Sequence, residues 1–462
     1  MKKIVFSLCF LLLVALPAPF AQAQNGTLLN IEETFTATVL TDGLDAPWEM
    51  LWGPDNMLWV TERHGKRITR VEPTSGDKQV LLTIEDAFVG PQHEGILGMA
   101  FGPGMAAKKG KVYVVYTYRE KQDDPATEFE RVVRFDWDGS ALKNQATIIE
   151  GIPAGDDHNG GRLLFGPDGK LYLSKGELGH NQFGNACKPI EAQRLPTAQE
   201  LKNKNYAAYV GKVLRMNADG GIPSDNPTIK GVRSHIFTYG HRNPQGLVFV
   251  GKDLYSSEQG PSTDDEINRL VAGGNYGWPH VAGFRDDNAY RYANYSEAPN
   301  CASLKFDANV IPKGVPIQKE TDWSAPDFVP PVKTFYTVRD DYNFTDARCG
   351  GENYPCWPTI APASITYYPS DGPIPGWGNS LLVTSLKNGT VYRLPLSDDK
   401  KQIQGDVKTY FHSPNRYRVA RVSPDGRTVY LATDTGGPVF DYNGKLTHTM
   451  QNPGAIIRID YK

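Results

Sequence analysis

A turn-and-strand unit recurs along the 462-residue chain. Each copy has a turn of the Gly/Ser-Pro-Asp-Gly type, followed by a short run in which apolar and polar residues alternate. Pro presets the turn angles, Gly and Asn tolerate positive φ, and the β-branched and aromatic runs have strand length and strand period. About six copies occur, and their turns begin at Gly53, Gly102, Gly166, Gly251, Gly376 and Ser423. The repetition predicts an all-β chain built from blade-like units.

The copies are unevenly spaced, and the widest gap lies between Gly251 and Gly376. Long loops must therefore be inserted there, and long loops on a rigid scaffold commonly carry function. Strong helical periodicity is confined to short stretches such as residues 197–202, which argues against an α/β fold with crossover helices. A pair of β-sandwiches with similar turns stays open as the alternative to a propeller.

The N-terminal residues have the pattern of a secretory signal. Lys2 and Lys3 precede an apolar run over residues 4–17, and the small residues Ala21 and Ala23 follow at a typical cleavage distance. We expect residues 1–23 to be a signal peptide and residues 24–462 to form one catalytic domain. No later segment approaches the roughly 20 uninterrupted apolar residues of a membrane span. The sequence thus predicts an exported protein, periplasmic or secreted, without a membrane span.

The formal net charge is −3, and removal of Lys2 and Lys3 with the signal makes the mature chain more acidic. A general surface for nucleic acid or anionic membranes is therefore not expected. Any cluster of basic residues is therefore expected to serve one particular site and not a general anion-binding surface.

Four cysteines remain once Cys9 leaves with the signal, and they allow three disulfide pairings. Cys349 and Cys356 share one Gly/Pro-rich turn, so we prefer a local bridge there, which leaves Cys187 with Cys301. Disulfides persist in the oxidising compartments that exported proteins reach. The alternative, a metal site, needs closer clusters of Cys or His than Cys187 and Cys301 provide.

Generic enzyme signatures are missing: the sequence has no phosphate-binding Gly-rich loop before a helix, no Gly-x-Ser-x-Gly and no His-Glu-x-x-His. Dense polar motifs occur instead, namely GDDHNGGRL (155–163), GHRNPQG (240–246), SEQGP (257–261) with DDE (264–266), CWPT (356–359), SLK (385–387) and NRYR (415–418). Together with the stretches GGNYGWP and YTVRDDYN, and in this order, they resemble the soluble glucose dehydrogenases of the glucose/sorbosone dehydrogenase family, which depend on pyrroloquinoline quinone (PQQ). The resemblance runs from about Leu51 to the C-terminus.

This resemblance implies a six-bladed β-propeller of four-stranded antiparallel blades with long inserted loops, and PQQ bound over the central channel. PQQ is a planar ortho-quinone with three carboxylates, so its site should offer fixed cations. Lys387, Arg416 and Arg418, with Arg242 opposite, are expected to supply them. By the same resemblance Asn243 and Thr359 hydrogen-bond the cofactor. Without the resemblance, residues 416–418 would be read as a solvated strand.

Calcium is the second implied cofactor. It is a hard cation that takes oxygen ligands, and the Gly260–Pro261 turn can present two backbone carbonyls to one ion. Family members are further expected to hold a calcium pair that supports a homodimer interface. The positions that match those ligands are Glu266, Tyr276, Ala282, Asp286 and Glu320. The alternative for this acidic segment is hydrated surface.

His158 matches the family's catalytic position, where an imidazole can take the proton of a sugar C1 hydroxyl as hydride leaves C1. Taken alone, a His beside Asp157 in a Gly-rich loop is more often a surface residue. The resemblance places Asp157 among the catalytic and substrate contacts, and Glu177 as the carboxylate that orients the base. The soluble glucose enzymes carry Asp in place of Glu177 and Arg in place of His180, which puts the fine geometry in doubt.

Three further residues are expected at the sugar. Gln92 should hold it near its reactive hydroxyl, and Tyr354 and Trp357 offer apolar faces to a pyranose ring. Arg242 should also lie where negative charge develops during hydride transfer. Aromatic residues of this kind more often belong to a core.

The implied activity is oxidation of an aldose, a mono- or disaccharide, to a lactone, with electrons passed to an external acceptor such as a quinone, a cytochrome or a dye. One alternative is a calcium-dependent propeller lactonase or other hydrolase, which gives Lys387, Arg416 and Arg418 no reason to converge. The other is a non-catalytic extracellular propeller that binds a protein or glycan. Retention of every proposed catalytic residue type argues against it.

Overall fold

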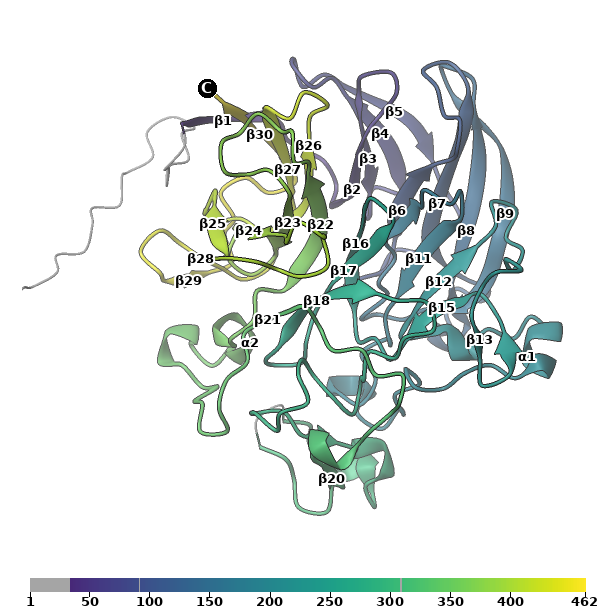
Figure 1. Ribbon diagram of the computed structural model, residues 1–462, viewed down its shortest axis with the longest axis vertical. Coiled ribbons are helices and arrows are strands. Elements are labelled where there is room, and N and C mark those ends of the chain that lie inside the picture. Colours follow the sequence, from purple (N-terminus) through teal and green to yellow (C-terminus); the bar gives the residue numbers. More distant parts are fainter. Residues whose placement is uncertain (1–33, 91, 308–309) are drawn as a thin grey trace, which may run out of the picture.

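The computed structural model describes residues 34–90, 92–307 and 310–462. Their regular structure is nearly all β, in six four-stranded antiparallel sheets arranged as blades around a central axis (Figure 1). The prediction of an all-β, six-bladed propeller is therefore confirmed. The predicted signal peptide, residues 1–23, lies outside the described residues and stays a prediction.

Each blade has four strands, ordered from the innermost outwards. Blade 1 has β2 (Pro47–Trp52), β3 (Leu58–Glu62), β4 (Arg67–Val71) and β5 (Lys78–Thr83). Blade 2 has β6 (Ile96–Phe101), β7 (Gly110–Arg119), β8 (Glu128–Trp137) and β9 (Leu142–Pro153). Blade 3 has β10 (Leu163–Phe165), β11 (Leu171–Lys175), β12 (Lys212–Met216) and β15 (Ile236–Tyr239).

Blade 4 has β16 (Pro244–Val250), β17 (Asp253–Glu258), β18 (Asp265–Leu270) and β21 (Lys333–Phe335). Blade 5 has β22 (Pro362–Tyr368), β23 (Ser380–Ser385), β24 (Val391–Pro395) and β25 (Lys408–Tyr410). Blade 6 has β26 (Tyr417–Val422), β27 (Thr428–Thr433), β30 (Ile456–Tyr461) and β1 (Phe35–Thr41).

Blade 6 closes the ring, because its outermost strand comes from the N-terminal side of the chain. In the antiparallel pair of β1 and β30, Phe35 lies opposite Tyr461 and Thr38 lies opposite Arg458 (Figure 1). Closure of this kind pairs strands that are far apart in the sequence, and it gives blade 6 four strands, the same number as in each other blade.

Apolar side chains fill the spaces between neighbouring blades. Trp59 of blade 1, for example, packs in one cluster with Ile96, Met99 and Val112 of blade 2. Inner strands such as β3 are buried throughout, whereas the outermost strand β5 is largely exposed. The core is thus a ring of inter-blade layers, and the innermost strands surround the axis.

The repeated turns seen in the sequence join the innermost strand of each blade to the second one. The runs after the six turns form β3, β7, β11, β17, β23 and β27. At the opposite rim the innermost strands begin and the second strands end. Several innermost strands have a register shift there, between Pro244 and Gly246 or between Pro362 and Ser364, for example. A β-bulge re-aims side chains, and this rim carries the candidate site.

Inserted loops hold the remaining elements. They are β13 (Thr228–Ile229), β14 (Val232–Arg233), β19 (Tyr292–Ala293), β20 (Ile317–Gln318), β28 (Val439–Phe440), β29 (Leu446–Thr447), α1 (Ala198–Lys202), α2 (Asn353–Cys356), and the 3₁₀ helices η1 (Pro125–Thr127), η2 (Phe183–Asn185), η3 (Ala207–Tyr209), η4 (Tyr295–Glu297), η5 (Cys301–Ser303), η6 (Glu320–Asp322) and η7 (Ala347–Cys349). The loops that carry β20 and α2 lie outside the ring of blades (Figure 1). The helix expected within residues 197–202 is α1, which a capping box of Thr197 and Glu200 starts.

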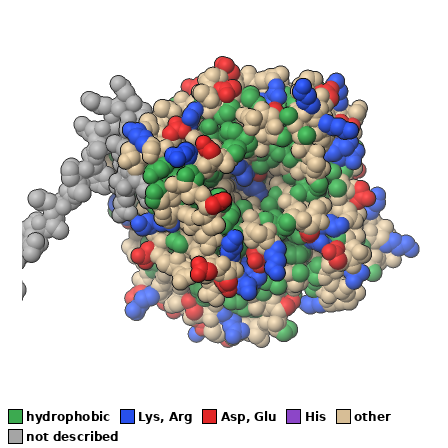
Figure 2. Space-filling view, turned by 45° about the horizontal axis from the view of Figure 1, so that its top comes forward, with side chains coloured by type: hydrophobic (Ala, Val, Ile, Leu, Met, Phe, Trp, Pro, Cys, Tyr) green, Lys and Arg blue, Asp and Glu red, His purple; other side chains and the backbone are tan. Residues whose placement is uncertain are grey.

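Two disulfides fix these loops. Cys187 is joined to Cys301, and Cys349 is joined to Cys356, so the preferred pairing is confirmed. In the ranges that the structure describes, no helix is long and apolar enough to cross a membrane. Basic and acidic side chains are interspersed over the face shown in Figure 2, which is hollowed near its middle.

Candidate active site

A cavity of about 480 Å³ lies at the rim where the innermost strands begin. Loops before β6, β10, β16, β22 and β26 supply its floor, and inserted loops supply its outer wall. Of the site residues expected from the sequence, those that line it are Gln92, Asp157, His158, Arg242, Gly260, Pro261, Tyr354, Trp357, Thr359, Arg416 and Arg418. Blades 2 to 6 thus contribute to one shared space.

His158 and Glu177 form a buried pair at the floor of this cavity. Nδ1 of His158 lies 2.6 Å from Oε1 of Glu177, and the other oxygen, Oε2, accepts the backbone N–H of His180 at 3.0 Å. The close approach of the Gly176 backbone to the His158 loop requires a glycine, because a Cβ at residue 176 would lie 2.0 Å from the carbonyl oxygen of His158. His158 itself adopts φ +42°, an unusual conformation for a non-glycine residue. The loop therefore holds its imidazole in one orientation, with Nε2 left for chemistry.

Asp157 lies beside the other nitrogen of His158. Its Oδ1 is 3.5 Å from Nε2 of His158 and 2.9 Å from Nδ1 of His93, and its Oδ2 accepts a hydrogen bond from Gln182 at 3.0 Å. Burial acts to raise the pKa of Asp157, but His158, His93 and Arg242 outweigh it and hold that pKa well below its usual range. The Asp157 carboxylate is therefore ionised and faces the cavity.

Three arginines from two blades line the same cavity. Arg242 donates to the carbonyl oxygen of Gln259 at 3.1 Å and to Gln182, while its buried Nε has no hydrogen-bond partner among the described residues. The Nε of Arg416 is likewise buried, without a partner in the described ranges. Arg418 pairs with Asp434 at 2.7 Å. Buried N–H groups without acceptors are uncommon, and here they lie on side chains that line a cavity.

Asp434 lies between the basic groups of blade 6 and blade 1. Burial acts to raise its pKa, but Arg418, Arg416 and Arg63 hold the pKa of this carboxyl well below its usual range. One carboxylate thus faces three guanidinium groups, so the cluster keeps an excess of positive charge for an anionic ligand.

Lys387 does not line the cavity but lies directly behind it. Its Nζ donates to Oγ1 of Thr359 at 2.8 Å and to the carbonyl oxygen of Trp357. Burial lowers the pKa of Lys387, an effect that nearby Asp265 opposes. Asn243 is also buried behind the lining, and its side chain donates to Gln259 at 3.2 Å. These two expected cofactor contacts therefore reach the cavity surface only through the residues that they support.

Asp265 joins two rim loops, a role that the sequence did not suggest. Its carboxylate accepts the backbone N–H groups of Gly260 at 2.8 Å, Ile360 at 2.6 Å and Ala361 at 2.7 Å. Burial raises its pKa, although these donors and Lys387 act in the opposite direction. The carboxylate holds the Gly260 turn of blade 4 against the loop that begins blade 5.

The expected calcium residues fall into two connected groups. Glu266, Tyr276 and Ala282 line a second, small cavity of about 10 Å³ together with Gly260 and Pro261. Burial and nearby Glu258 raise the pKa of Glu266 well above its usual value. That cavity is about the size of one water molecule or ion.

Asp286 and Glu320 lie on the far side of Ala282. The Glu320 carboxylate accepts the backbone N–H of Ala282 at 2.9 Å and that of Asp286 at 3.2 Å. Among the described residues, no group of three or more His, Cys, Asp or Glu side chains is arranged to hold a metal ion. A cation in this region would therefore depend on backbone oxygens as well.

The aromatic residues expected at the sugar lie on a constrained turn. Tyr354 and Trp357 pack edge to face, with ring centroids 5.9 Å apart, and the disulfide of Cys349 and Cys356 spans the same turn. A third aromatic residue, Trp278, was not expected, and its ring lies 5.4 Å from the guanidinium carbon of Arg242.

Several lining residues escaped prediction from the sequence. His93 adjoins the expected Gln92, Gln182 ends the segment that begins at Glu177, and Gln259 precedes the Gly260–Pro261 turn. Each lies in a quoted motif or within a few residues of a residue expected at the site, so nearness in the sequence was the available signal. The outer wall comes from inserted loops. It includes His180, which the sequence had marked as a departure from the family, and Phe183, Tyr295, Phe306 and Phe344, for which the sequence carried no signal.

Comparisons with known proteins identify a family for this chain. The family model described as Glucose / Sorbosone dehydrogenase matches residues 44–315 and 350–441. Quinoprotein glucose dehydrogenase B of Acinetobacter calcoaceticus is 43% identical over 456 residues, which covers 96% of this chain and 94% of that protein.

Two solved structures share the fold. The PQQ-bound form of an aldose sugar dehydrogenase from Streptomyces coelicolor is 24% identical with a TM-score of 0.59, over 93% of this chain and 98% of that one. The apo-form of the soluble aldose sugar dehydrogenase from Escherichia coli is 24% identical with a TM-score of 0.63, over 93% and 100%. The motif resemblance and the matched family model agree along most of the sequence, and this chain belongs to the glucose/sorbosone dehydrogenase family.

Proposed function

We propose that this protein is a PQQ- and Ca²⁺-dependent aldose 1-dehydrogenase that oxidises the anomeric carbon of a sugar such as glucose to a lactone. The observation that carries the proposal is one cavity that joins a buried His158–Glu177 pair to Arg242, Arg416 and Arg418. The reaction requires two parts from the chain: a base, and a set of cations that holds the carboxylates of the cofactor. Arg242, Arg416 and Arg418 form that set, which we call the arginine cradle.

The residues fit a flat tricarboxylate. Arg242, Arg416 and Arg418 line the cavity, and the Nε–H groups of the first two, which have no partner in the part of the chain that the structure describes, can donate to carboxylate or quinone oxygens. Thr359, which Lys387 supports from behind, offers a hydroxyl at the same surface. When bound, PQQ supplies the hydride acceptor. A lactonase mechanism would leave this set of cations without a role.

The chain's own part in the reaction is to bind the sugar and remove a proton. His158 takes the proton of the C1 hydroxyl at Nε2, while Glu177 accepts its Nδ1–H and stabilises the imidazolium that forms. Asp157 and Gln92 face the same space and can accept or donate hydrogen bonds to sugar hydroxyls. Tyr354 and Trp357 offer their rings to the apolar side of a pyranose.

Calcium fits beside the Gly260–Pro261 turn. The support is a small cavity lined by this turn and by Glu266, whose buried carboxylate accepts hydrogen bonds from Gly283 and Asn268 but pairs with no cation among the described residues. An oxygen-rich site of this kind favours a hard cation. Glu266, Tyr276, Ala282, Asp286 and Glu320 continue the same region and would hold the expected calcium pair, partly through backbone oxygens. Transfer of electrons to an external acceptor, export to the periplasm or medium, and a homodimer belong to the same proposal.

The test is reconstitution of purified apoprotein with PQQ and CaCl₂, followed by addition of glucose and an artificial dye acceptor. Dye reduction that requires PQQ, and that a chelator added before PQQ prevents, supports the proposal. Lactone cleavage without any acceptor would favour a hydrolase instead. Failure to bind PQQ in a fluorescence titration would refute the assignment of the arginine cradle.

A further inference from the structure

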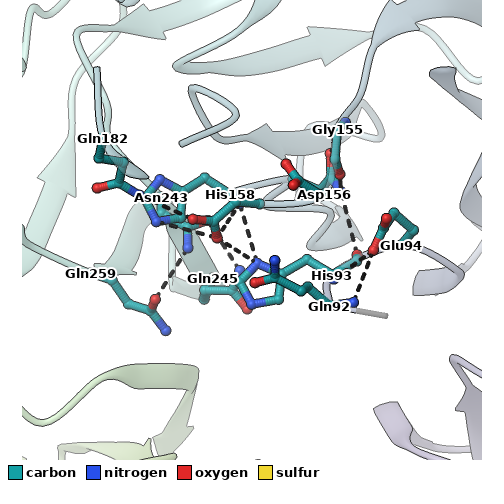
Figure 3. Close-up of polar contacts among 12 residues, drawn as sticks. Gln92, His93, Glu94, Gly155, Asp156, His158, Gln182, Asn243, Gln245 and Gln259 are labelled. Atoms are coloured by element: carbon teal, nitrogen blue, oxygen red, sulfur yellow. Dashed lines mark hydrogen bonds and ion pairs between the residues drawn. The ribbon is translucent and has the colours of Figure 1, made fainter. Parts of the chain in front are cut away.

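His93 lines the cavity at the tip of the loop before β6, next to the proposed catalytic residues (Figure 3). We infer that His93 is a positioning residue, whose Nδ1–H donates to Asp157 and holds that carboxylate beside Nε2 of His158. The inference rests on the proposed function for its consequences in catalysis. It assigns to this chain a pair of histidines that share one aspartate.

The contacts around Nδ1 of His93 define its protonation. Oδ1 of Asp157 lies 2.9 Å away, and the backbone N–H of His158 is directed at the same Nδ1 from 3.2 Å. That N–H is shared, because it also donates to Oδ1 of Asp157 at the shorter distance of 2.9 Å, so it does not need Nδ1 as its acceptor. An unprotonated Nδ1 would place its lone pair against an ionised carboxylate at hydrogen-bond distance. The proton therefore belongs on Nδ1 of His93.

The two histidines then have matching tautomers with different partners. His158 donates its Nδ1–H to Glu177 at 2.6 Å, and His93 donates its Nδ1–H to Asp157. Oδ1 of Asp157 remains 3.5 Å from Nε2 of His158, the nitrogen that receives the sugar proton. An imidazolium formed there lies between the Glu177 and Asp157 carboxylates.

The backbone around His93 is also fixed. The Glu94 carboxylate accepts the backbone N–H of His93 at 2.9 Å, and the side chain of Asn159 donates to its carbonyl oxygen at 3.4 Å. The imidazole of His93 keeps 37% of its surface exposed towards the cavity. Without the Nδ1–H of His93, the Asp157 carboxylate would keep only Gln182 and one backbone N–H as donors. The carboxylate could then turn towards Arg242 and away from the substrate.

The first test compares His93→Asn with His93→Leu. The Nδ2–H of Asn can take the place of Nδ1–H, whereas Leu removes the donor and keeps similar bulk. Displacement of Asp157 should lower kcat/KM for glucose about 30-fold in the Leu variant, since small misplacements at a reacting centre cost up to about 100-fold. The Asn variant should stay within about threefold of wild type on the same reasoning.

Two controls accompany this comparison. His64→Leu removes a partly exposed histidine that does not line the cavity, and it should leave kcat/KM unchanged. PQQ titration by fluorescence should give the same affinity for all variants. Wild-type kcat/KM in His93→Leu, or equal losses in the Asn and Leu variants, would overturn the inference.

The second test does not depend on activity. Nitrogen-15 NMR of the apoprotein imidazoles should show His93 protonated at Nδ1, and Asp157→Asn should remove that preference. A wild-type His93 protonated only at Nε2 overturns the inference, whatever the cofactor is. Conversely, absence of PQQ-dependent dye reduction in the wild type would refute the proposed function, while the NMR result would still decide the role of His93.

Discussion

Nδ1 of His158 lies 2.6 Å from Oε1 of Glu177, and the Glu177 side chain is completely buried. The sequence raised doubt at this position, because the resembling enzymes carry Asp. The structure accommodates the longer side chain by giving its second oxygen the backbone N–H of His180. Both oxygens are therefore used, and the carboxylate is held in one place against the imidazole.

Replacement of Glu177 by Gln should lower kcat about 10²- to 10³-fold and leave PQQ affinity unchanged, because the amide cannot stabilise the imidazolium of His158. Stopped-flow reduction of the bound cofactor by glucose measures this step. Glu177→Asp is the matched control, and it should lose no more than about tenfold, since it keeps the charge. Equal rates in Gln and wild type would remove the pair from the mechanism.

Charge reversal at Arg416 should weaken PQQ binding about 30-fold or more, because one charge-assisted donor is lost and a like charge faces the carboxylates. Arg427→Glu makes the same change on an exposed residue beyond the opposite end of β26. That control should bind PQQ as wild type does. Fluorescence titration of apoprotein compares the three, and an unchanged affinity for Arg416→Glu would contradict its place in the cradle.

The repeated turns predicted the inner half of every blade, because each turn and its following run build one hairpin by local contacts. The outer strands are less regular, and β1 joins blade 6 by pairing with a strand more than 400 residues away in the sequence. The inserted loops that wall the cavity have no periodic signal. The repeats therefore predicted an all-β chain of blade-like units, the family resemblance implied the six-bladed propeller, and neither predicted the residues of the wall.

The candidate site was predictable where residues cluster in motifs. Residues 155–163 and 240–246 lie at the starts of β10 and β16, and both reach the cavity. Motif position cannot say which side chain faces the ligand and which one supports it. Lys387 lies behind Thr359, and His93 lies beside Asp157, because loop conformation decides those orientations.

Arg162 joins four blades beneath the cavity, and its replacement by Met should lower the free energy of unfolding by about 3 kcal/mol. Its guanidinium donates to Glu49 at 2.6 Å and to the carbonyl oxygens of Gln245 and Ala363, each at 3.0 Å. Loss of Arg162 leaves Glu49 buried, with Arg421 as its remaining cation. Urea unfolding measures the change. The double variant with Glu49→Gln should recover part of the loss, and a wild-type midpoint for the single variant would contradict this role.

Glu128 makes the stability of blade 2 depend on pH. Burial raises the pKa of Glu128 to about 7, although Arg119 donates to its Oε2 at 2.9 Å, and Oε1 has no hydrogen-bond partner among the described residues. Between the unfolded value of 4.5 and about 7, the folded state binds the proton more tightly than the unfolded chain does. Stability therefore falls as the pH rises through this window, and the cost is complete above it.

Replacement of Glu128 by Gln removes the titration but keeps an oxygen for Arg119. The Gln variant should match wild type near pH 4.5 and become more stable than wild type by up to about 3 kcal/mol at pH 8, because each pKa unit corresponds to about 1.4 kcal/mol. Thermal unfolding at a series of pH values measures the growing difference. The control is Glu120→Gln. Glu120 is exposed and directly follows β7, the strand whose last residue pairs with Glu128, and its replacement should show no such trend. A constant difference between Glu128→Gln and wild type across this range would show that the Glu128 carboxyl is ionised throughout.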